Sequence, residues 1–154
     1  MAPSLPLELQ IFLSVCAFVL SLAGAYIAFQ SWNTARNKLK LDLFERRLTV
    51  FEGATNFVGS IVTSGKVEPL ALSKYLATTR TTRWVLNESV SQYLSKNLLE
   101  PAMSLQHLDA ELNAMPVGEE RTKNVECQRK IKSNLNAQFK YLDEVFSPFL
   151  QLKD

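Results

Sequence analysis

The chain has 154 residues, of which 47% are hydrophobic and 21% are charged, a balance typical of a folded protein rather than a disordered one. Its net charge of +2 lacks the strong basic excess of proteins that bind duplex nucleic acid, so no duplex partner is expected. Five glycines and six prolines are few for this length, which favours a largely helical chain.

An uncharged, mostly apolar segment covers residues 11–29. As a helix it rises about 28 Å, close to the roughly 30 Å hydrocarbon core of a bilayer, so we expect a retained transmembrane span. Two alternatives stay open. One is a cleaved export signal, because Ala23-Gly24-Ala25 resembles a cleavage site, although Glu8 stands where export signals carry positive charge. The other is a buried helix of a soluble fold.

Basic residues follow the apolar segment directly. Arg36, Lys38 and Lys40 lie within eight residues of Trp32, whereas Glu8 is the one charged residue before the segment. The positive-inside rule therefore predicts a short N-terminus outside the membrane and a C-terminal part in the cytoplasm. We expect residues 1–32 to form the membrane anchor and residues 33–154 a cytoplasmic domain. The three basic side chains are predicted to contact anionic lipid headgroups.

Small residues recur within the apolar segment at spacings of three and four, at Ser14, Ala17, Ser21, Gly24 and Ala28. Small residues at such spacings let transmembrane helices approach closely, where packing drives association. The pattern predicts self-association into a homo-oligomer. Chance alignment of residues that are common in spans is the alternative.

The remaining sequence predicts an all-α fold. Helices are expected over residues 7–63, from Pro69, over residues 87–115 and from Glu119 to near Pro148. Two apolar stripes mark the buried face of the first helix: Leu41, Phe44, Leu48, Phe51, Thr55, Val58 and Val62, and beside them Leu43, Val50, Ala54, Phe57 and Ile61. Three long helices and one short one predict an antiparallel bundle, with the first helix continuous with the span. Gly65 is expected to end that helix, and Pro101 to kink the third.

Catalytic constellations are missing from the sequence. His107 is the one histidine, and no phosphate loop or nucleophile elbow occurs. We therefore expect no enzyme activity, no catalytic residue, no metal site and no cofactor. Arg80, Arg83 and Trp84, among four threonines, could bind a nucleotide, since guanidinium groups and hydroxyls suit phosphate and an indole can stack on a base. In the alternative interpretation, both arginines pair with surface acids and Trp84 fills the core.

Three segments of the chain, residues 37–61, "ATTRTTRWVL" at 77–86 and "MPVGEER" at 115–121, carry a resemblance to a known family. They resemble an uncharacterised family of small bacterial membrane proteins, in which a single N-terminal span precedes a "KLRLDLF" helix, an "ATR" stretch and a "LPVGEER"-like turn. The resemblance implies a bacterial inner membrane setting, and it implies no reaction.

Two functions follow as hypotheses. The first is a non-enzymatic, single-pass inner-membrane protein that acts through self-association or through a cytoplasmic protein partner. The alternative is a membrane effector, similar in architecture to antiphage proteins, whose cytoplasmic domain senses a nucleotide messenger and whose spans then disrupt the membrane. That alternative rests on analogy of fold alone.

Overall fold

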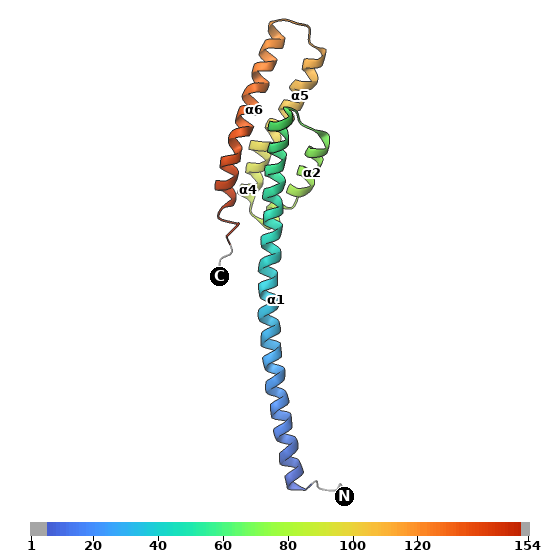
Figure 1. Cartoon of the computed structure of the whole chain (residues 1–154), viewed down its shortest axis with the longest axis vertical. Coiled ribbons are helices and arrows are strands. Elements are labelled where there is room, and N and C mark those ends of the chain that lie inside the picture. The colour runs from blue at the N-terminus through green and yellow to red at the C-terminus, as the bar shows by residue number, and fades with distance from the viewer. Residues whose placement is uncertain (1–5, 152–154) are drawn as a thin grey trace. The chain divides into compact units, whose positions relative to one another are not determined.

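The computed structural model describes residues 6–151, and all regular secondary structure in this range is helical, which confirms the all-α prediction. The elements, in chain order, are α1 (Leu7–Ser64), α2 (Pro69–Thr79), α3 (Thr82–Val85), α4 (Glu88–Tyr93), the π-helical segment η1 (Leu94–Leu99), α5 (Glu100–Ala114) and α6 (Glu119–Phe146) (Figure 1). The chain divides into an N-terminal unit, residues 1–42, and a C-terminal unit, residues 43–154. Helix α1 contributes residues to both units.

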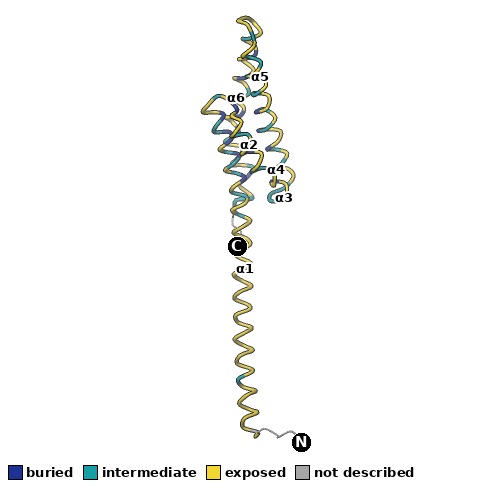
Figure 2. Tube along the Cα trace, turned by 90° about the vertical axis from the view of Figure 1, so that its right-hand side faces the viewer, coloured by how far each residue is buried: buried dark blue, intermediate teal, exposed yellow. Residues whose placement is uncertain are grey.

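The N-terminal unit is a single helical segment whose described side chains are almost all exposed (Figure 2). Two hydroxyl groups in it bond to backbone carbonyls one turn earlier. The Ser14 hydroxyl donates to the Gln10 carbonyl at 2.8 Å, and the Thr34 hydroxyl to the Gln30 carbonyl at 2.9 Å. Such bonds satisfy hydroxyls without a polar partner on another helix.

The helices of the C-terminal unit share one hydrophobic core. Its fully buried members come from α1, α2, the 88–114 helical stretch and α6, and include Ala54, Val58, Ile61, Leu98, Ala102, Leu135, Leu142 and Phe146. The Phe57 ring stacks on the Tyr75 ring with 4.3 Å between centroids, which joins α1 to α2. The Phe51 and Phe146 rings lie 5.4 Å apart and join α1 to α6.

The buried face of α1 follows the second of the two predicted apolar stripes rather than the first. Val50, Ala54, Phe57 and Ile61, from the neighbouring stripe, are buried, and Val58 is the one fully buried member of the first stripe. Val62 and Leu41 of the first stripe are exposed. Two adjacent apolar stripes on one helix show which side is apolar, but the position of the packing helices decides which stripe is buried.

Helix termini follow the residues that predicted them. Gly65 has a φ of +73° in the left-handed region, and its N–H donates to the Ile61 carbonyl at 2.8 Å, which ends α1. Pro69 is the first residue of α2. The Asn87 side chain accepts a hydrogen bond from the Val90 N–H at 2.8 Å and caps α4.

The helix around Pro101 is irregular in a different way from the predicted kink. Residues 94–99 form the π-helical segment η1, and the Glu100 N–H donates to the Ser95 carbonyl, five residues earlier. Proline offers no N–H to the turn before it, so a wider turn just ahead of Pro101 accommodates the ring. A wider turn of this kind has no distinct sequence pattern.

Helix α6 buries three polar side chains. Asn124, Gln128 and Gln138 are buried beside the apolar residues. The Asn124 amide donates to the Leu108 carbonyl at 3.1 Å, and the Gln128 amide donates to the Asn124 side-chain oxygen at 2.9 Å. The first bond links α6 to α5, and the second lies within α6. Helix α6 ends at Phe146, as the later Pro148 predicted.

Candidate functional sites

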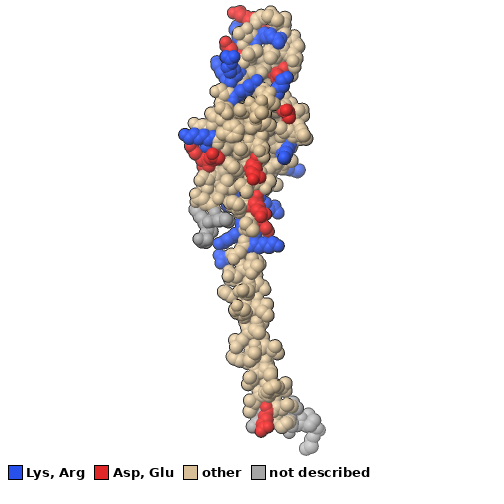
Figure 3. Space-filling model, in the orientation of Figure 1, with Lys and Arg blue, Asp and Glu red and all other residues tan. Residues whose placement is uncertain are grey.

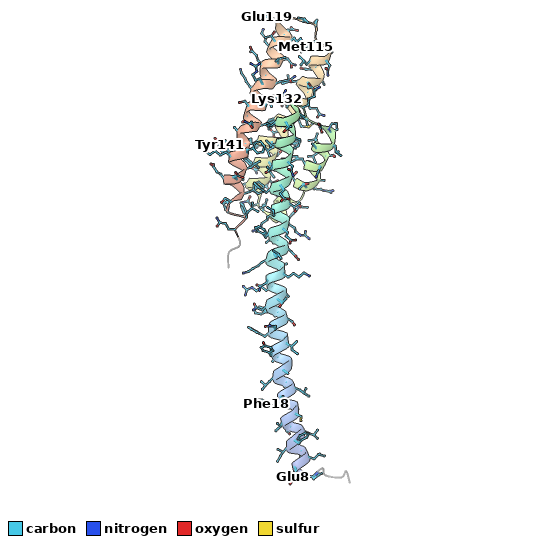
Figure 4. All side chains as sticks on the ribbon, viewed as in Figure 1. Glu8, Phe18, Met115, Glu119, Lys132 and Tyr141 are labelled. Carbon is cyan, nitrogen blue, oxygen red and sulfur yellow. The ribbon has the colours of Figure 1, made fainter. Side chains whose placement is uncertain are left out.

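The apolar part of α1 is long and apolar enough to cross a membrane, and no residue of its most apolar window is buried. Phe18 and Leu20 keep 65% and 72% of their surface exposed. The space-filling view shows no charged side chain along this stretch, and Phe18 projects away from the helix (Figures 3 and 4). The alternative of a helix buried in a soluble fold is therefore wrong for this structure.

The five small residues of the proposed self-association seam all lie on this exposed helix. A Cβ added at Gly24 would meet no atom within 4 Å. The spacing also continues through Ser31 and Ala35, beyond the predicted span. Because the structure is of one chain, self-association through Ser14, Ala17, Ser21, Gly24 and Ala28 stays a prediction.

The basic flank is exposed. Arg36, Lys38 and Lys40 all lie on the surface of α1. The Arg36 guanidinium lies 5.8 Å from the centroid of the Trp32 ring, so one face of the indole carries a cation. An indole with a neighbouring cation suits the membrane interface. Contact of Arg36, Lys38 and Lys40 with lipid headgroups stays a prediction.

Arg46 and Arg47 lie on α1 among the acids Asp42, Glu45 and Glu52, but within the described residues neither forms an ion pair. Arg47 instead donates from Nε to the Val85 carbonyl and from Nη1 to the Phe149 carbonyl, both at 3.2 Å. It thereby joins α1 to the end of α3 and to the segment after α6. Arg46 is exposed and takes part in no ion pair within residues 6–151.

The predicted nucleotide site is brought together only in part. Arg83 donates from Nε to a Glu88 carboxylate oxygen at 2.7 Å, and its guanidinium lies 5.8 Å from the Trp84 ring centroid. Trp84 is 83% exposed, so the interpretation in which it fills the core is wrong. Arg80 lies on the surface at the end of α2, and the described residues offer it no ion pair. Ligand binding by the three residues stays a prediction.

A small polar pocket lies where α2 meets the 88–114 helical stretch. Its volume is about 120 Å³, and its lining consists of Tyr75, Thr79, Thr82, Ser91, Leu94, Ser95 and Leu99. The Tyr75 hydroxyl donates to the Leu94 carbonyl at 3.0 Å, and burial raises the pKa of Tyr75. The Thr82 hydroxyl is buried without a hydrogen-bond partner in the described structure. No sequence pattern pointed to this pocket, because its hydroxyls come from four separate elements, α2, α3, α4 and η1.

His107 lies on the surface, where its Nε2 is 3.0 Å from a Glu111 carboxylate oxygen. Within the described range, no three His, Cys, Asp or Glu side chains are placed to hold a metal ion. Cys16 and Cys127 are both free thiols.

Comparison of the chain with protein-family models, with curated proteins and with solved structures gives no match.

Proposed function

We propose that this chain is a non-enzymatic, single-pass membrane protein whose C-terminal helices act through self-association or through a cytoplasmic protein partner. The observation that carries the proposal is the charge-free stretch of α1, none of whose most apolar window is buried within the chain. Exposing apolar surface to water costs about 25 cal/mol for each Å², so a continuous apolar helix needs a cover. A bilayer provides that cover along its whole length.

In the proposed arrangement, the N-terminus lies outside a bacterial inner membrane and residues 33–154 form a cytoplasmic antiparallel bundle continuous with the span. The basic residues Arg36, Lys38 and Lys40 support this orientation, since they follow the apolar stretch and are free to meet lipid headgroups. The resemblance in residues 37–61 supports the bacterial setting.

Self-association is tested by the native mass of the full-length protein in lipid nanodiscs or mild detergent. We expect an oligomer that the substitution Gly24→Leu weakens, because a larger side chain in the seam separates the helix backbones. Ala23→Leu, about 100° around the same helix, is the matched control and keeps the oligomer. A monomeric wild-type protein that also retains no partner in affinity purification would refute the proposal.

A gated membrane effector is the second candidate, and the exposed Trp84 beside Arg83 favours it. An indole on the surface is free to stack on a base, while Arg80 and Arg83 offer guanidinium groups to phosphate. Calorimetric titration of the full chain in nanodiscs with cyclic and linear oligonucleotides tests this candidate. Binding that Trp84→Ala abolishes would support it, and no heat with any oligonucleotide would end it.

A further inference from the structure

Arg46 lies in an open groove between α1 and the end of α2. The groove has a volume of about 350 Å³, near the lower end of the range for small-molecule sites. Its lining comes from α1, α2 and the turn before α3, and consists of Arg46, Thr49, Val50, Ala77, Thr78 and Thr81. Arg46 is the only charged residue in that lining.

Two hydrogen-bond donors in this groove, the Arg46 guanidinium and the Thr81 hydroxyl, have no partner among the described residues. Arg46 is in no ion pair among the described residues, although Glu45 precedes it in the chain. Thr81 stands at the N-cap of α3, and its side chain makes no capping hydrogen bond. A guanidinium fork and a free hydroxyl are donors of the kind that bind phosphate oxygens.

The other two hydroxyl groups in the groove, on Thr49 and Thr78, can only accept hydrogen bonds from a ligand. The Thr49 hydroxyl donates to the Glu45 carbonyl and the Thr78 hydroxyl to the Lys74 carbonyl, each at 2.8 Å. Both hydroxyls have used their single hydrogen, so their oxygens offer only lone pairs to a ligand. They can accept hydrogen bonds from ligand hydroxyl groups.

A close helix contact holds one wall of the groove in place. A Cβ at Gly53 would lie 2.6 Å from the Thr78 methyl carbon, so α1 and α2 meet there at nearly the closest distance that side chains allow. Thr78 is β-branched and has few rotamers in a helix. The Thr78 wall is therefore rigid before any ligand arrives.

We propose that this groove binds a phosphate ester that carries free hydroxyl groups, with Arg46 and Thr81 donating to the phosphate and Thr49 and Thr78 accepting from the hydroxyls. Two sources have this chemistry: the glycerol phosphate headgroup of an anionic lipid, and a soluble sugar or polyol phosphate. The site is separate from the seam in residues 14–28, so it does not depend on self-association.

Calorimetric titration of the full-length protein with glycerol 3-phosphate, in nanodiscs of phosphatidylcholine, tests the site. We expect saturable binding that Arg46→Gln weakens by about tenfold or more, as the loss of a charged hydrogen bond predicts. Arg129→Gln removes the same charge from the exposed face of α6 and leaves binding unchanged. Ala77→Phe keeps every charge but fills the groove, and it also weakens binding.

A second arm separates the two sources. In nanodiscs that contain phosphatidylglycerol, weaker apparent binding of glycerol 3-phosphate means that lipid headgroups compete for the groove, and unchanged binding means a soluble ligand. No binding in phosphatidylcholine, or equal affinity of the wild type and Arg46→Gln, would overturn the site. Native mass is measured on the same samples, so failure of the site is distinguished from failure of self-association.

Discussion

Gly53 shows how much a single residue matters where two helices touch. An added Cβ would come within 2.6 Å of the Thr78 methyl carbon and 3.0 Å of its Cβ. Alanine normally favours a helix interior over glycine by up to about 1 kcal/mol, but crowding a packed contact costs about 1–3 kcal/mol. We predict that Gly53→Ala lowers the free energy of unfolding by about 1 kcal/mol, measured by urea denaturation followed by circular dichroism.

Gly59 on the same helix is the matched control for this prediction. A Cβ there would lie 3.8 Å from the Phe139 ring, an ordinary contact distance. Gly59→Ala is therefore expected to stabilise the protein by about 0.5–1 kcal/mol. Thr78→Ala should restore stability to the Gly53→Ala variant. Equal effects of the two glycine substitutions would contradict the close contact.

Two phenols, the buried Tyr75 and the half-buried Tyr93, predict how stability depends on alkaline pH. Burial, aided by the nearby Tyr141, raises the pKa of Tyr93 from 10.0 to about 12, and burial raises that of Tyr75 as well. Above pH 10 the unfolded chain loses these protons while the folded chain keeps them. The unfolded state then binds fewer protons than the folded state. The contribution of these two tyrosines to the free energy of unfolding is therefore fully present below pH 10 and is lost as pH rises toward about 12.

Tyr75→Phe is expected to reduce this alkaline loss of stability. It should also lower stability near neutral pH by about 1 kcal/mol, because the Leu94 carbonyl loses its hydrogen-bond donor. Unfolding by urea at pH about 8 and about 11 measures both effects. An identical pH dependence in wild type and Tyr75→Phe would count against the buried phenol.

At the scale of elements, Arg47 links α1 to two other segments. Its guanidinium donates to the Val85 and Phe149 carbonyls and lies 6.0 Å from the Phe149 ring centroid. Arg47→Met keeps much of the aliphatic stem but removes both donors. Hydrogen bonds from charged groups are worth about 1.5–3 kcal/mol, so we predict a loss of that order in the free energy of unfolding.

The neighbouring arginine provides the comparison for Arg47. Arg46→Met is expected to change the free energy of unfolding by less than about 0.5 kcal/mol, since Arg46 is exposed and has no ion pair within the described range. Equal destabilisation by the two substitutions in a urea titration would show that Arg47 does not link these segments.

The sequence predicted where helices begin and end better than how they pack. Gly65, Pro69 and Asn87 act within one turn of the chain, so their effect is visible locally. The short helix α3 was not among the predicted helices, and η1 has no local pattern of its own. Burial of Asn124 and Gln128 depends on carbonyls and amides offered by neighbours in the fold.

At the scale of the whole molecule, the apolar stretch was predictable because its length and lack of charge are properties of the sequence alone. The groove around Arg46 was not predictable, because Arg46 and Thr81 are far apart in the chain and line one groove only in the fold. Arg83 and Trp84 are neighbours in sequence, so their proximity could be anticipated, but the ion pair to Glu88 and the exposure of Trp84 could not.

The central claim is that residues 11–29 span a membrane with the C-terminal unit on the cytoplasmic side, and the two free cysteines test it directly. Cys127 is exposed on α6, and Cys16 lies in the apolar stretch. The measurement is labelling with a membrane-impermeant maleimide in single-cysteine variants, in intact cells and in membranes washed at alkaline pH.

We predict that Cys16→Ser protein stays in the washed membranes, and that its Cys127 reacts only once the cell envelope is opened. In the Cys127→Ser variant, Cys16 should stay unreactive until detergent removes the lipid. Release of the protein by the alkaline wash, or reaction of Cys127 in intact cells, would contradict the account.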